Sequence, residues 1–178
     1  MFRFLLEFIR PVLSRACAKP YNDAVDAITI VEEPPDSVDA ARLLSELDAD
    51  LQRHPYPAES RHAFSIEQLL CEQVAFFVTR YHSEPAACGG LKVFDDYGEV
   101  KRMYVRPAFR GLGLGKAMLN RLSEYARDRQ VSVLRLETGI HQTEAIGLYE
   151  RFGFQRRPPF GDYEDDPLSV YYEKSITR

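Results

Sequence analysis

The sequence predicts a mixed α/β fold in which an antiparallel part of a sheet comes first and a strand–helix–strand crossover follows. Three β-rich runs stand in a row at residues 74–81, 86–94 and 99–105, joined by short polar connections. This order is typical of an antiparallel meander. A helical pattern at residues 114–128 then precedes the run at residues 133–138, whose nearly continuous apolar character favours a central strand buried on both faces.

The chain before the meander predicts one strand and two helices. Residues 27–32 form the strand, and two prolines end it. The first helix extends through residue 53, because apolar residues recur there at helical spacing. A shorter helix through Leu70 begins at Ser65, which forms a capping-box pattern with Gln68.

The chain after the central strand predicts a helix and a closing hairpin. The helix spans residues 143–151, and two strands follow near residues 154–157 and 169–174, joined by a loop rich in proline and aspartate. No internal repeat or linker divides the chain. We therefore expect one domain over residues 27–178 and an N-terminal extension, with a short apolar helix, over residues 1–26.

Composition and cysteine usage limit the function classes. With 178 residues, 45% of them hydrophobic, and a net charge of −4, the chain suits a soluble globular protein and lacks the basic footprint that nucleic-acid binding needs. Its three cysteines show neither zinc spacing nor a disulfide framework. We expect no metal, a reducing cytoplasmic location, and core positions for Cys71 and Cys88.

The first 18 residues are strongly apolar but carry three arginines. A bilayer span needs about 20 predominantly apolar residues, and Glu7, Arg10 and Pro11 interrupt this run. An interfacial helix or a transit peptide are the alternatives to a short extra helix or tail. We favour the extra helix or tail, so membrane contact by residues 1–18 is the less favoured interpretation.

The stretch RGLGLGK at residues 110–116 places three glycines at alternate positions between a predicted strand and a predicted helix. Glycine lets backbone amides approach an anion, and the helix N-terminus adds unpaired N–H groups. Arg110 and Lys116 supply full charges at either end. The pattern indicates a phosphate or pyrophosphate site made by Arg110, Gly111, Leu112, Gly113, Leu114, Gly115 and Lys116.

Two common phosphate motifs do not fit this loop. A P-loop requires glycine where Arg110 stands and serine or threonine where Ala117 stands. A dinucleotide fingerprint requires a third glycine where Lys116 stands. The loop resembles instead the R-x-x-G-x-G/A loop of the GNAT (Gcn5-related) acyltransferases, with Arg110, Gly113 and Gly115 in register.

A second motif strengthens the resemblance. Residues 145–154 (AIGLYERFGF) are similar to the GNAT pattern A-x-x-L-Y-x-x-x-G-F. The resemblance covers residues 74–176 well, the preceding strand and helices more loosely, and residues 1–26 not at all. It implies the acyl-CoA N-acyltransferase fold, a mostly antiparallel sheet of six to seven strands with splayed central strands and about four flanking helices.

The resemblance also implies a cofactor and its contacts. Acetyl-CoA is the expected co-substrate, with its pyrophosphate on the loop at residues 110–116. The backbone of Met103, Tyr104 and Val105 would bind the pantetheine arm. The family usually has asparagine three residues before the alanine of the second motif, and Gln142 stands there.

The expected chemistry needs an acid and a base. Tyr149 matches the tyrosine that often protonates the leaving thiolate in this family; the other interpretation is a packed helix tyrosine. Glu99 lies where many members place the base, or it pairs with a neighbouring basic residue, Lys101 or Arg102. Glu137, His141 and a water chain are further candidates.

The resemblance therefore implies an N-acetyltransferase that moves an acetyl group directly from acetyl-CoA to a primary amine of a small molecule or amino acid. Basic residues gather at residues 101–121 and acidic ones at 162–166, which would suit an anionic cofactor and a cationic acceptor, or two solvated patches. The alternative is a non-catalytic CoA-binding regulatory or interaction protein with the same fold. A monomer or a homodimer is expected.

Overall fold

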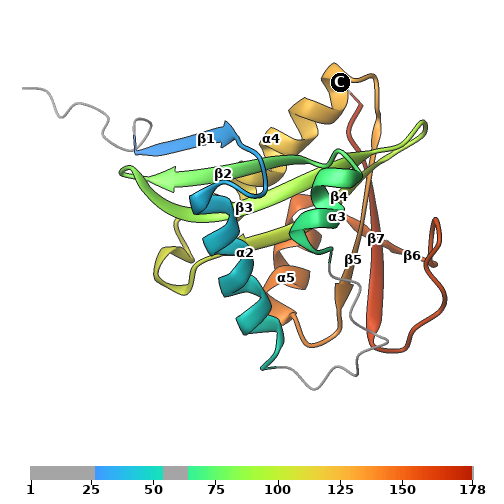
Figure 1. The fold of residues 1–178 in the computed structure, drawn as a ribbon. Helices are drawn as coiled ribbons and strands as arrows, with labels where there is room; N and C mark the ends of the chain where they lie inside the picture. Colours follow the sequence, from blue (N-terminus) through green and yellow to red (C-terminus); the bar gives the residue numbers. More distant parts are fainter. Residues whose placement is uncertain (1–26, 54–63, 178) are drawn as a thin grey trace, which may run out of the picture.

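The computed structural model describes residues 27–53 and 64–177 and contains one seven-stranded sheet with the strand order β1-β2-β3-β4-β5-β7-β6 (Figure 1). The strands are β1 (Ile28–Glu32), β2 (Ala75–Tyr81), β3 (Glu84–Val93), β4 (Gly98–Val105), β5 (Val133–Gly139), β6 (Gln155–Arg157) and β7 (Ser169–Ser175). The helices are α2 (Val38–Leu51), α3 (Ile66–Cys71), α4 (Leu114–Asp128) and α5 (Thr143–Phe152), with a short 3-10 helix η2 (Pro107–Phe109). The predicted fold class and element order are confirmed.

Two element boundaries differ from the prediction by two residues: α2 ends at Leu51 rather than at residue 53, and β3 begins at Glu84 rather than at residue 86. Tyr81 pairs with Glu84, so the connection is a two-residue turn of His82 and Ser83 rather than the predicted four residues. Both turn residues have positive φ, 47° and 69°. The turn has the backbone of a tight hairpin without the Asn-Gly or Asp-Gly pair that normally announces one.

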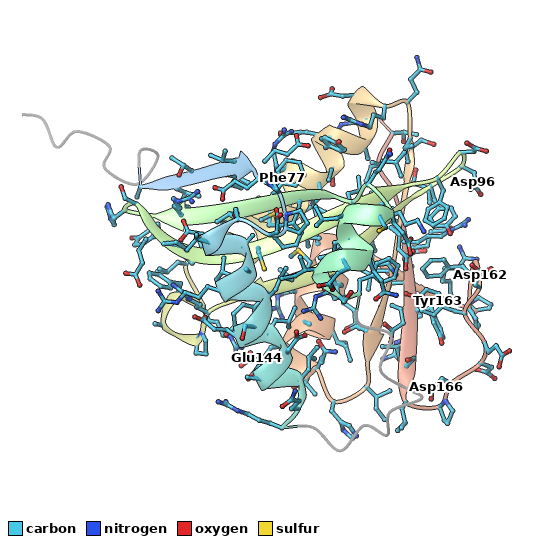
Figure 2. All side chains as sticks on the ribbon, in the orientation of Figure 1. Phe77, Asp96, Glu144, Asp162, Tyr163 and Asp166 are labelled. Carbon is cyan, nitrogen blue, oxygen red and sulfur yellow. The ribbon has the colours of Figure 1, made fainter. Side chains whose placement is uncertain are left out.

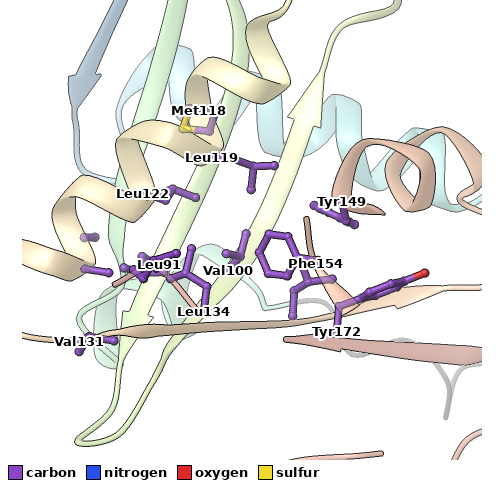
Figure 3. Packing of buried hydrophobic residues seen from close by; sticks show 14 of the residues in the cluster. Leu91, Val100, Met118, Leu119, Leu122, Val131, Leu134, Tyr149, Phe154 and Tyr172 are labelled. Carbon is purple, nitrogen blue, oxygen red and sulfur yellow. The ribbon is translucent and has the colours of Figure 1, made fainter. Parts of the chain in front are cut away.

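The helices cover both faces of the sheet. In Figure 1, α2 and α3 lie on one face, and α4 and α5 lie on the other. On the second face, Met118, Leu119 and Leu122 of α4 pack with Leu91 and Leu134 (Figure 3). Below, we call this side the α5 face and the side that carries α2 the α2 face. The leucines of α2 fill a separate core on the α2 face.

The sheet opens between β4 and β5. These parallel strands pair only at Gly98 with Leu134 and Glu99 with Arg135, although both continue for several residues. A bulge near Arg102, whose φ is 55°, shifts the register between β3 and β4, and bulges bend strands. The predicted splay of the central strands is confirmed, and one edge of β4 faces the opening.

The predictions for residues 1–26, including the apolar helix and its membrane contact, concern a segment outside the described residues. Within residues 27–53 and 64–177, no helix has the length and apolar character needed to cross a bilayer.

The two described cysteines differ in environment. Cys88 is buried in the sheet, as predicted, and burial raises the pKa of its thiol to about 12. Cys71 is exposed at the end of α3, so its predicted core position is wrong. The six-residue helix α3 buries only Leu69 among its residues.

We predict that iodoacetamide at pH 8 modifies Cys71 in the native protein and leaves Cys88 unmodified, since only a thiolate reacts rapidly. Peptide mass mapping after timed labelling would measure both sites, and labelling in denaturant is the control. Equal native labelling of the two cysteines would contradict this environment.

Candidate active site

The glycine-rich loop at the start of α4 presents a row of free backbone donors. Gly111 and Gly113 both have φ of 81°, a left-handed conformation that favours glycine. Gly113 is the N-cap of α4 and supplies no side-chain cap. In the part of the chain that the structure describes, none of the amides of residues 111–116 donates a hydrogen bond to a protein acceptor. Six such donors beside a positive helix end make an anion site.

The third glycine of the loop has a different role. A Cβ at Gly115 would lie 2.7 Å from Leu148 Cδ2, and the φ of Gly115 is not positive. Gly115 therefore lets α4 pack closely against α5. Leu148 is the leucine of the second motif, so this contact joins the two motifs in space.

Arg110 donates to three acceptors, one near it in the chain and two from distant segments. Its Nε donates to the carbonyl of Val105 at 3.2 Å, and its Nη1 donates to Glu144 Oε2 of α5 at 2.6 Å. Its Nη2 donates to Asp50 Oδ2 of α2 at 3.4 Å. Its side chain is 38% exposed, and that of Glu144 is 73% exposed. The guanidinium thus lies beside the glycine loop. Two of its N–H groups donate to carboxylates, and a phosphate could accept hydrogen bonds from the same N–H groups.

The predicted basic cluster is divided between the packing of α2 and the glycine-rich loop. Arg102 and Arg106 are turned toward α2, where they pair with Asp48 at 2.6 Å and Glu46 at 2.7 Å. These arginines serve the packing of α2. At the loop itself, Arg110 is joined by Lys116, whose side chain is exposed in the first turn of α4.

The predicted pantetheine segment lies along the opening. Tyr104 is buried against α2, whereas Met103 packs toward α4. Tyr104 and Val105 pair with β3 on one side, and their other edge faces the gap beside β5. Gln142 occupies the N-cap position of α5, and its side chain makes no capping hydrogen bond.

Tyr149 lies on α5 on the α5 face, with its ring against Phe154 and Tyr172 at centroid distances of 5.8 and 6.4 Å (Figure 3). It is 6% exposed. Its hydroxyl makes no hydrogen bond with the described residues. Burial, and secondarily the charge of Glu137, raise the pKa of Tyr149 well above its usual range. The phenol therefore stays protonated at neutral pH and can act as a proton donor.

Glu99 lies in a buried cluster with Lys101 and Tyr163. Lys101 Nζ is 2.6 Å from Glu99 Oε1, and the side chains are 9% and 5% exposed. Lys101 also donates to the Tyr163 hydroxyl at 2.8 Å, and this hydroxyl donates to Glu99 Oε1 at 2.7 Å. An ammonium group can only donate, which sets these directions. Of the two roles considered for Glu99, the structure contains the pairing with Lys101.

Glu137 lies on β5 and accepts a hydrogen bond from Ser169 Oγ of β7 at 2.6 Å. His141 is exposed in the turn between β5 and α5. Tyr163 belongs to the loop before β7, on which Asp162 and Asp166 also lie (Figure 2). The sequence reasoning missed Tyr163 and Ser169, because their partners are 64 and 32 residues away along the chain.

Groups of three or more histidine, cysteine, aspartate or glutamate side chains that could hold a metal are absent from the described residues. The candidate site consists of backbone donors, one arginine, two lysines, tyrosines and carboxylates.

Comparison with known families gives a match over a region that contains both the glycine-rich loop and Tyr149. Residues 42–154 match the model of the acetyltransferase (GNAT) family. The "IAA acetyltransferase" of Azospirillum brasilense is 40% identical over 151 residues, which cover 84% of this chain and 98% of that protein. YsnE of Bacillus subtilis, an uncharacterised N-acetyltransferase, is 38% identical over 67% of this chain and 82% of its own length.

Solved structures of acyltransferases and acetyltransferases have a similar fold. A Klebsiella pneumoniae structure described as an acyl-CoA N-acyltransferase is similar with a TM-score of 0.71 and 35% identity, and the match covers 84% of this chain and 98% of that one. An acetyltransferase of Salmonella typhimurium, solved with acetyl-CoA, has the same fold with a TM-score of 0.62 and 18% identity, covering 85% of this chain and 95% of the other.

Proposed function

This chain belongs to the GNAT family of acetyltransferases, and we propose that it transfers an acetyl group from acetyl-CoA to a primary amine of a small molecule or amino acid. One observation carries the choice of donor: the six unpaired amides of residues 111–116 lie beside Arg110, at the end of the open edge of β4. The proposed domain for this activity spans residues 27–178, with residues 1–26 as an extension, and its proposed location is the cytoplasm.

The proposed binding mode follows the opening of the sheet. The pyrophosphate accepts hydrogen bonds from the loop amides and from Arg110, which exchanges carboxylate partners for phosphate oxygens. The pantetheine arm lies along the edge of β4 at Met103, Tyr104 and Val105. Gln142, whose side chain makes no capping hydrogen bond at the start of α5, is the proposed side-chain contact to this arm.

The proposed reaction is direct transfer. The acceptor nitrogen attacks the thioester carbonyl, a C–N bond forms and the C–S bond breaks. A carboxylate takes one proton from the ammonium before the attack, and the nitrogen loses a second proton to solvent as the C–S bond breaks. The leaving thiolate takes the proton of the Tyr149 phenol, which solvent later replaces. An ammonium and a thioester thus give an amide, a thiol and one released proton.

Two observations bear on the choice of acceptor. The acidic residues 162–166, on the loop that carries Tyr163, favour a cationic amine near the acceptor side. Because a relative with 40% identity is named for IAA, the acceptor panel should include IAA beside primary amines and amino acids.

Two measurements test this function. Isothermal titration should show acetyl-CoA binding, and release of free thiol should accelerate with at least one acceptor of the panel. Binding without acceptor-dependent thiol release would support instead the non-catalytic CoA-binding protein. An absence of binding at millimolar acetyl-CoA would contradict both.

A further inference from the structure

The opening between β4 and β5 is approached from both faces of the sheet. Tyr149 lies on the α5 face, where its ring packs with Phe154 and Tyr172. The side chains of Glu99 and Lys101 lie on the α2 face, with Tyr163. A thioester in the opening would therefore have its proton donor on the α5 face and would meet the amine from the α2 face.

The strand register places a second carboxylate on the α2 face. Glu99 pairs with Arg135, which is the last pair before the strands diverge. Successive side chains alternate between the faces of a strand, so Glu137 lies on the same face, two residues beyond Arg135. By the same register it stands across the opening from Lys101.

Glu99 is committed to other partners. Its Oε1 accepts from both Lys101 and Tyr163, and its side chain is almost completely buried. A proton arriving on Glu99 would leave the Lys101 ammonium buried without its counter-charge, which is costly. This cluster also connects β4 to the loop that carries Tyr163, so it has a structural role of its own.

Glu137 has the surroundings of a working base. Its side chain is partly exposed, so an ammonium can approach it. Ser169 holds its Oε1 in place from β7. Of the two carboxylates, Glu137 is the one whose charge raises the pKa of Tyr149, so it is close enough to influence the proton donor electrostatically.

We propose that Glu137 is the general base of the reaction, that Ser169 is its positioning residue, and that Glu99 forms a structural ion pair. The assignment rests on the proposed function. Glu137 takes one proton from the acceptor ammonium, and the neutral nitrogen forms the C–N bond. The nitrogen then gives its second proton to solvent, and Glu137 later releases its own proton to solvent. Tyr149 protonates the thiolate from the other face, so the two proton transfers use different groups.

The primary test compares Glu137→Gln with Glu99→Gln, using the best acceptor of the panel. Glu137→Gln should lower kcat by about 10²–10⁴-fold and leave acetyl-CoA affinity and the melting temperature nearly unchanged. Glu99→Gln should lower the melting temperature but keep kcat within about tenfold of wild type below that temperature, because it breaks the buried pair and spares the base.

The pH profile supplies a readout that a purely structural role would not change. In wild type, kcat/KM for the acceptor should vary little between pH 7 and 9, because Glu137 accepts the ammonium proton. In Glu137→Gln it should rise about tenfold per pH unit, since only amine that is already neutral reacts. Tyr149, Tyr163 and Tyr171, which face Glu137 from α5, the loop and β7, have raised pKa values and stay protonated in this range.

Ser169 has its own test. Ser169→Ala should lower kcat about tenfold, which is the size expected for losing a hydrogen bond to a charged group, without changing the Kd of acetyl-CoA. Ser169→Thr should restore most of the lost kcat.

Full activity in a folded Glu137→Gln variant, or a flat pH profile for it, would overturn the assignment and leave the acetyltransferase function standing. Failure of wild type to bind acetyl-CoA would overturn both.

Discussion

Replacing Tyr149 with phenylalanine is expected to lower kcat by about 10²–10⁴-fold, with acetyl-CoA affinity within about twofold of wild type. The ring stays packed against Phe154 and Tyr172, and only the hydroxyl is lost. Because burial raises the pKa of Tyr149, the phenol remains a donor throughout the neutral and mildly alkaline range. Without it, the thiolate must leave unprotonated or take a proton from water.

Tyr172→Phe is the matched control for this variant. It removes a neighbouring hydroxyl, which donates to Glu150 at 2.8 Å, while the ring contact with Tyr149 persists. Its kcat should stay within about threefold of wild type, since the variant loses only the hydrogen bonds of Tyr172 with Glu150 and Arg156, neither of which involves Tyr149. Wild-type turnover in Tyr149→Phe, or equal losses in both variants, would refute the role of Tyr149. Steady-state kinetics and isothermal titration measure the two quantities separately.

Replacing Arg110 with glutamine should weaken acetyl-CoA binding by about 10- to 100-fold at low salt, with a smaller change in kcat at saturation. The charge-assisted bonds to the pyrophosphate are lost, whereas the loop amides remain. The guanidinium is partly exposed, so salt screens part of its contribution. The difference from wild type should therefore shrink in titrations at about 0.5 M salt.

Glu144→Gln should have the opposite effect. The carboxylate of Glu144 competes with phosphate for Arg110 Nη1, so its neutralisation should tighten acetyl-CoA binding about two- to fivefold, the range for an exposed ion pair. The control for Arg110→Gln is Arg129→Gln at the far end of α4. It removes one positive charge, as Arg110→Gln does, and should change the affinity for acetyl-CoA little. Equal effects of Arg110→Gln and Arg129→Gln would mean that only the overall charge matters.

Some features of the site could be predicted only in part. The loop at residues 110–116 was recognised from its glycines, but the structure separates their roles: Gly111 and Gly113 adopt left-handed conformations, and Gly115 makes room for Leu148. The sequence predicts a core position for Cys71 as it does for Cys88, but Cys71 is exposed. Which side of a six-residue helix is buried depends on what packs against it, and a helix that short has little periodicity to reveal it.

The sequence by itself determined the element order, the glycine-rich turn before α4 and the place of Tyr149 on α5, because periodicity, caps and glycine spacing are local signals carried by neighbouring residues. Only the tertiary structure decided which partners each carboxylate has. Lys101 and Tyr163 converge on Glu99, and Ser169 on Glu137, because strand register and a loop that folds back join segments far apart in the chain. The charge of a side chain is written in the sequence, whereas its partners are set by the packing of the sheet.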